Sequence, residues 1–182
     1  MRTAFSIVLA TAAVAAVLMA QTAPEGLPWP NGVYLRSGGD WVVIPANPLV
    51  PFTNASDARW LLGFGQSDAT VEMPGPHALV QLGNTRPTFY LRGIPSSYGI
   101  YLLRSQQRED YRMIRMPMSR DFRQFTKFRT QDMVELELKN VSGDVITATP
   151  RTELKPGEYA LVSVFQQNER QIRASFDFGV AR

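Results

Sequence analysis

The sequence contains no cysteine and a single histidine, and both shortages limit the chemistry available to it. Without cysteine the chain has no disulfide, no thiolate nucleophile and no zinc site of the usual cysteine–histidine kind. A Ser-His-Asp arrangement would have to use His77, which follows the turn residues Pro74-Gly-Pro76 and is more typical of a surface loop. The sequence therefore predicts no catalytic residue, no cofactor and no metal site.

Helical periodicity is also lacking, and no apolar run after residue 20 is long enough to cross a bilayer. An apolar content of 45% and an aromatic content of 10% still provide for a substantial core and exclude a wholly disordered chain. We expect a globular all-β protein with no membrane span beyond its N-terminal run.

That run, residues 1–20, has the composition of a secretory signal peptide. Arg2 supplies a positive start, Ala4–Leu18 is apolar, and the small residue Ala20 precedes the expected cleavage at Gln21. The alternative is an uncleaved anchor, because the run approaches the length that spans a bilayer. Exported domains without cysteine are typical of bacteria, so we expect a periplasmic protein or one at the bacterial cell surface.

Short segments of alternating hydrophobicity predict antiparallel strands. Gly38-Gly39 joins Val33–Arg36 to Trp41–Ile44 as a tight hairpin. Val134–Leu138 and Ile172–Val180 each alternate apolar with polar residues, which predicts one buried and one solvated face. For residues 119–131 we favour an irregular strand over a short helix. Further strands are expected at Arg59–Leu62, Ala78–Leu82, Thr88–Arg92, Ile100–Arg104 and Asp110–Met116.

Proline divides the chain, since ten of its 13 prolines lie between Pro24 and Pro95. This distribution predicts a loop-rich, proline-rich β region over residues 21–96 and a more regular sheet over residues 97–182. The expected hinge is Ile94–Tyr98. The sequence leaves open whether residues 21–96 form a separate domain.

The most specific structural motif is Leu154-Lys155-Pro156-Gly157-Glu158-Tyr159, followed by an apolar strand. It resembles the tyrosine corner of Greek-key β-sandwiches, which include immunoglobulin-like and fibronectin-type domains. The resemblance implies that Pro156-Gly157 turns the chain between two sheets while Leu154 enters the core. It also implies that the Tyr159 hydroxyl bonds back to the backbone. A hairpin of Tyr159–Gln166 with Gln171–Val180 is expected to complete a Greek-key sandwich over residues 97–182.

The whole chain also looks like uncharacterised exported bacterial proteins. The shared features are Gly32-Val-Tyr34 with Trp41 near the start, Pro156–Ala160, and Asp177–Val180 at the end. This likeness implies a compartment and little about activity. The Asp-Phe-Gly triplet is not read as a kinase motif, because none of the other kinase motifs accompanies it.

Basic residues are concentrated between Arg104 and Arg129, a segment with eight basic and only three acidic residues. An exported protein rarely meets nucleic acid, so an acidic glycan, a phospholipid or a protein is the more sensible partner. Arg112 and Arg115 have opposite parity on a strand and converge only if the edge is twisted. The alternative is an ordinary solvated face. The candidate partner-binding residues are Arg104, Arg112, Arg115, Arg120 and Arg123.

Two further groups of side chains allow a functional and a structural interpretation. The methionines Met113, Met116 and Met118 suit either Cu(I) or core packing, and packing is favoured. Aromatic residues of the first half suit either a platform for sugar rings or core filling, and core filling is favoured. These aromatic residues are Trp29, Tyr34, Trp41, Trp60 and Tyr90.

These observations predict a non-enzymatic exported β-protein that binds or scaffolds an envelope protein or glycan. The alternative is an envelope hydrolase whose working group is Ser67 or a carboxylate such as Glu135 or Glu137. Alternation with an apolar face favours a solvated role for both glutamates.

Overall fold

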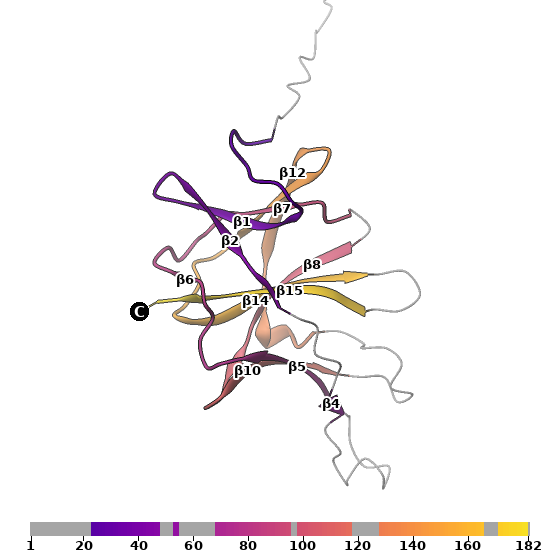
Figure 1. Cartoon of the computed structure of the whole chain (residues 1–182). Helices are drawn as coiled ribbons and strands as arrows, with labels where there is room; N and C mark the ends of the chain where they lie inside the picture. The colour runs from indigo at the N-terminus through magenta and orange to yellow at the C-terminus, as the bar shows by residue number, and fades with distance from the viewer. Residues whose placement is uncertain are drawn as a thin grey trace, which may run out of the picture.

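The computed structural model describes residues 23–47, 53–54, 68–95, 98–117, 128–165 and 171–181, and nearly all of its regular structure is β-strand (Figure 1). The all-β fold class predicted from the sequence is confirmed. Within these ranges the only helical element is the 3-10 turn η1 (Thr130–Asp132), and no helix there has the length and apolarity to cross a membrane. The N-terminal run 1–20, the expected strand Arg59–Leu62 and most of segment 119–131 lie outside the described residues.

The strands form three sheets, which we call sheets A, B and C. Sheet A has the order β12 (Leu136–Ser142), β13 (Val145–Pro150), β7 (Phe89–Arg92), β1 (Gly32–Ser37) and β2 (Asp40–Ile44). Sheet B has the order β11 (Met133–Val134), β8 (Tyr98–Arg104), β14 (Gly157–Phe165), β15 (Gln171–Val180) and β3 (Ala46–Asn47), with β6 (Gln81–Leu82) parallel to the end of β15. Sheet C has the order β4 (Thr53–Asn54), β5 (Asp68–Pro74), β10 (Tyr111–Pro117) and β9 (Gln106–Gln107).

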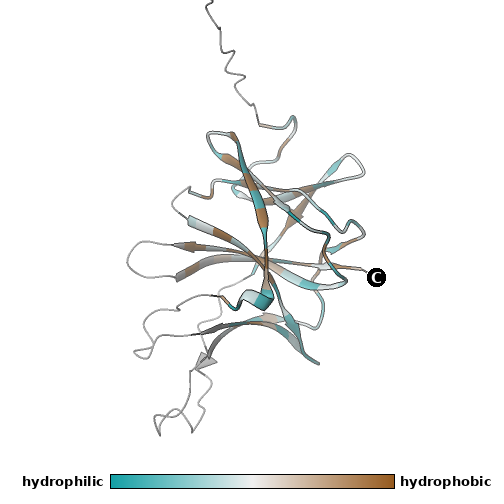
Figure 2. Ribbon diagram, turned by 180° about the vertical axis from the view of Figure 1, so that it is seen from behind, coloured by the Kyte–Doolittle hydropathy of each residue, from teal (hydrophilic) through white to brown (hydrophobic). Residues whose placement is uncertain are grey.

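Sheet B lies between the other two sheets, as Figure 1 shows. Tyr159 and Leu161 of β14 belong to the apolar core shared with sheet A, whereas Ala160 and Val162 belong to the core shared with sheet C. Brown apolar and teal polar positions follow one another along the strand that crosses the front of Figure 2. The middle sheet is therefore buried on both faces, which explains the nearly continuous apolar run of β14.

Both predicted hairpins are confirmed. β1 pairs with β2 so that Ser37 faces Asp40, and the two residues between them are Gly38 and Gly39, with φ angles of 60° and 103°. Those positive angles are the reason for a glycine pair at this turn. β14 pairs with β15 from Gly157–Val180 to Phe165–Gln171.

Two expectations about strand faces are wrong. The alternation over Val134–Leu138 does not form one strand, because the chain leaves sheet B after Val134 and enters sheet A at Leu136. The polar face predicted for β15 is not solvated, since Ser175 and Asp177 are buried against sheet C. Alternation predicts a second face in contact with water, whereas this face meets another sheet.

The expected boundary near residue 97 does not coincide with a division between sheets. Sheet A combines β1, β2 and β7 with β12 and β13, and sheet C combines β4 and β5 with β9 and β10. Sheet B likewise takes β3 and β6 from the first half. Each layer therefore depends on both halves of the chain.

Candidate functional site

The corner motif has the contacts that its sequence predicts. The Tyr159 hydroxyl donates a hydrogen bond to the Lys155 carbonyl oxygen at 2.7 Å, and Leu154 is buried in the core between sheets A and B. Gly157 has φ of +149°, a conformation that other residues rarely adopt, and lies against the Arg104 guanidinium. Burial raises the pKa of Tyr159, an effect that the Arg104 guanidinium partly opposes. These residues hold the start of β14.

The predicted arginine patch does not assemble among the described residues. Arg112 is only 2% exposed, so it is no part of a surface that a partner could reach. Arg104 donates to the Pro156 carbonyl oxygen at 3.0 Å and so belongs to the corner. β10 and β5 pair in continuous register from Arg112 to Arg115, so no bulge brings these two side chains to one face. Arg120 and Arg123 lie outside the described residues.

The carboxylates proposed for hydrolysis are ordinary surface groups. Glu137 accepts a hydrogen bond from Lys139 at 2.9 Å, and this contact lowers the pKa of Glu137. Glu135 is exposed and lies 4.0 Å from the Arg151 guanidinium. Ser67, the proposed nucleophile, and Met118, one of the possible copper ligands, lie outside the described residues, and Met113 is buried.

A buried polar cluster, which sequence reasoning missed, lies between sheets B and C at the end of their apolar core. Its first carboxylate is Glu158, which is only 5% exposed. It accepts hydrogen bonds from the backbone amide of Ala78 at 2.9 Å and from the side-chain amide of Gln81 at 3.3 Å. His77 Nδ1 lies 3.0 Å from Glu158 Oε1, the same oxygen that accepts from Gln81. The carboxylate thus orients the histidine, whose ring is largely exposed.

The second carboxylate of the buried polar cluster is Asp177. It forms a buried ion pair with Arg112 of β10 and accepts a hydrogen bond from Asn47 at 2.8 Å. Two other guanidinium nitrogens of Arg112 and the hydroxyls of Ser105 and Ser175 are buried without a hydrogen-bond partner in the described part of the chain. Groups of this kind usually bond to internal water. The pair joins sheet C to sheet B.

The buried polar cluster does not form a metal centre. Among the described residues no three His, Asp or Glu side chains converge as metal ligands. Within the cluster, a carboxylate orients His77 and thereby satisfies one part of a nucleophilic triad, but no described hydroxyl is bonded to the other ring nitrogen, which lies 3.4 Å from the Gln107 amide.

An exposed aromatic residue lies on the outer side of sheet A, where the N-terminal segment, indigo in Figure 1, runs beside β7 and the β12–β13 hairpin. Trp29 is 74% exposed, and the Arg92 guanidinium lies 4.0 Å from the centroid of its ring. Tyr34 is buried beneath and donates to the Pro30 carbonyl oxygen. Trp41 and Tyr90 pack edge to face at 5.0 Å. Of the expected aromatic group, Trp60 lies outside the described residues, and the other members divide into packed rings and the open ring of Trp29.

Arg92 holds the segment that presents this ring. Its buried guanidinium donates to the carbonyl oxygens of Leu27 at 3.0 Å and Pro28 at 2.8 Å, and to Asp144 Oδ2 at 3.1 Å. Asp144 also accepts from Ser142 at 3.1 Å, and its backbone carbonyl accepts from the Gly93 amide at 2.9 Å. We call Trp29, Asn31, Arg92 and Asp144 the Trp29 site.

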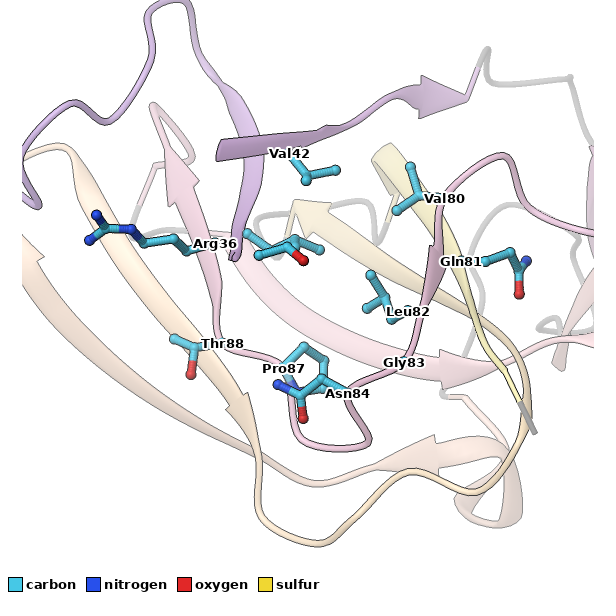
Figure 3. Close-up of a pocket in the computed structure, with 11 residues that line it drawn as sticks. Arg36, Val42, Val80, Gln81, Leu82, Gly83, Asn84, Pro87 and Thr88 are labelled. Carbon is cyan, nitrogen blue, oxygen red and sulfur yellow. The ribbon is translucent and has the colours of Figure 1, made fainter. Parts of the chain in front are cut away.

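A small cavity of about 120 Å³ opens between the β1–β2 hairpin and the β6 loop (Figure 3). Val42, Val80 and Leu82 line its interior, and Gln81 points away from it. The volume is well below the several hundred Å³ of ordinary ligand pockets. The cavity could hold one apolar side chain, and its size is also that of a minor gap in packing.

No local pattern in the sequence marks the buried polar cluster or the Trp29 site. Arg112 and Asp177 are 65 residues apart, and Arg92 and Leu27 are also 65 apart, so only the fold brings them together. One signal was available for the buried polar cluster. Glu158 immediately precedes the apolar run of β14, a position that favours a partnered carboxylate on a strand buried on both faces.

Comparison with known proteins finds no relative of this chain. No protein-family model matches the sequence, and no curated protein and no solved structure matches it.

Proposed function

We propose that this chain is an exported, non-enzymatic β-protein that binds a partner at a bacterial cell envelope. The observation that carries the proposal is Trp29, an exposed tryptophan whose segment is fastened by a buried arginine. An aromatic ring held in water by its own scaffold gains its contact area only when a partner covers it. The signal-like residues 1–20 support the envelope as the location.

Export and binding are tested separately. The full chain, expressed in a bacterial host with residues 1–20 in place, is expected in the envelope fraction with Gln21 as its N-terminus by mass spectrometry. Recovery of intact Met1 there would identify an anchor, and recovery only from the cytoplasm would contradict export.

Binding is measured by sedimentation of the recovered protein with a purified envelope preparation. Trp29→Ala is expected to reduce the bound fraction, whereas Leu79→Ala, which removes another exposed apolar side chain (91% exposed), leaves it unchanged. Equal sedimentation of all three proteins would contradict binding through Trp29.

The second candidate function is an envelope hydrolase, favoured by the bond between His77 and the buried Glu158. A histidine oriented by a carboxylate is the usual form of a general base. Turnover of generic ester and glycoside substrates, lost in His77→Ala, would establish this alternative. No turnover by the wild type would exclude it for those substrates.

A further inference from the structure

We infer that the Trp29 site binds a neutral saccharide, with the apolar face of a sugar ring stacked on Trp29. This inference rests on the proposed binding function and specifies its ligand. One face of the indole meets the Arg92 guanidinium at 4.0 Å from the ring centroid, which leaves the opposite face for a ligand. A flat apolar surface of this kind matches the C–H face of a pyranose.

The anchored backbone around Trp29 favours stacking. Arg92 is buried and bonds the two carbonyl groups that precede Trp29, while the Tyr34 hydroxyl bonds the carbonyl group of Pro30 that follows it. The backbone on both sides of the indole is therefore fixed before a ligand arrives. A backbone that is already anchored loses little conformational entropy on binding.

The local charge favours an uncharged ligand. The cation beneath the ring, Arg92, is already paired with Asp144 at 3.1 Å, and it also donates to two carbonyl oxygens. An acidic glycan would meet the exposed Asp144 carboxylate and find no unpaired charge at Arg92. The arginine patch that would have suited an acidic glycan does not assemble among the described residues.

Hydrogen-bonding groups stand beside the ring. Asp144 is 44% exposed, and Asn31 is also exposed, with its amide placed against Gly93. Gly93 has a φ of +70°, and a Cβ there would overlap the Asn31 amide, so glycine allows this close approach. A carboxylate and an amide next to an aromatic ring can bond the hydroxyls at the edge of a stacked sugar.

The test is a glycan array that carries neutral oligosaccharides of glucose, galactose, mannose and N-acetylglucosamine, sulfated and uronic-acid glycans, and proline-rich peptides. The full chain recovered from the host is compared with Trp29→Ala, Asn31→Ala and the control Leu79→Ala. We expect at least one neutral glycan to bind the wild type and the control alike. Trp29→Ala should lose roughly tenfold or more in affinity, and Asn31→Ala several-fold. Circular dichroism checks that each variant is folded.

Salt concentration separates neutral from charged recognition. Binding of a neutral sugar should change by less than about twofold between low and moderate salt, because an uncharged ligand forms no ion pair with the protein that salt could screen. Absence of neutral-glycan binding, equal binding by Trp29→Ala, or a steep loss with salt would each overturn the inference. If only the peptides bind in a Trp29-dependent manner, the saccharide is wrong while the proposed binding function stands. If Trp29→Ala equals wild type on the array and on envelopes, both fail.

Discussion

At the scale of single residues, the tyrosine corner is the feature for which the sequence was most informative. Its residues are contiguous, so the turn, the buried Leu154 and the bond from Tyr159 to Lys155 all follow from local chemistry. The same is true of Gly38-Gly39, whose φ angles depend on neighbouring atoms alone. Trp29 and Glu158 show the converse, because their partners come from distant strands.

Replacement of Tyr159 by phenylalanine should lower the free energy of unfolding by about 1–2 kcal/mol, since the Lys155 carbonyl group loses its hydrogen-bond donor. The measurement is the denaturant midpoint. Tyr90→Phe is the matched control, because Tyr90 is partly buried and packs through its ring against Trp41. An unchanged midpoint for Tyr159→Phe would contradict a stabilising role for this bond.

Tyr159 should also make stability depend on alkaline pH. Its folded pKa is raised above the ordinary value of 10.0, mainly by burial, so the folded state holds the proton more tightly than the unfolded state. The stabilisation is complete below pH 10 and is lost as the pH rises through the folded pKa. Thermal unfolding at increasing pH measures the loss, and Tyr159→Phe should lose less stability than wild type over the same interval. Parallel curves for the two proteins would contradict this assignment.

At the scale of elements, β14 and β15 show what periodicity can and cannot predict. Their antiparallel pairing follows from the apolar run of β14 and the alternation of β15. The environment of the second face does not, because alternation is the same whether polar residues meet water or a partner on another sheet. Asp177 meets Arg112 and Asn47, neither of which is near it in sequence.

The Arg112–Asp177 pair connects two sheets, and its removal should show strong coupling. Asp177→Leu alone leaves a buried guanidinium without its counter-ion and should cost about 3–5 kcal/mol in the free energy of unfolding. The double variant Arg112→Met/Asp177→Leu removes both charges and should be more stable than either single variant. Urea denaturation of the four proteins gives the cycle. Additive losses would show that the two groups act independently.

At the scale of the whole molecule, the all-β class was predictable but the interleaving of the sheets was not. Proline content separates residues 21–96 from residues 97–182 in sequence, because proline limits local pairing. Sheet membership depends on long-range pairs such as β1 with β7 and β7 with β13. Composition carries no information about such pairs.

This interleaving predicts that neither half folds alone. Fragments 21–96 and 97–182 should each lack a cooperative thermal transition, because every sheet would lose strands and expose its core. The two fragments mixed together are expected to regain part of the structure, and the full chain should unfold in one transition. A cooperative transition in either isolated fragment would identify it as an independent domain.

The position of β15 also determines the order in which the structure can form. This strand pairs with β14, β3 and β6, and Asn47 reaches Asp177 across 130 residues of sequence. Strands made early by the ribosome must therefore wait for one made near the end, and long loops have to close before the middle layer is complete. Such distant pairings slow folding. Slow folding suits the proposed export, because a chain without its middle layer is still unfolded enough to be threaded through a secretion pore.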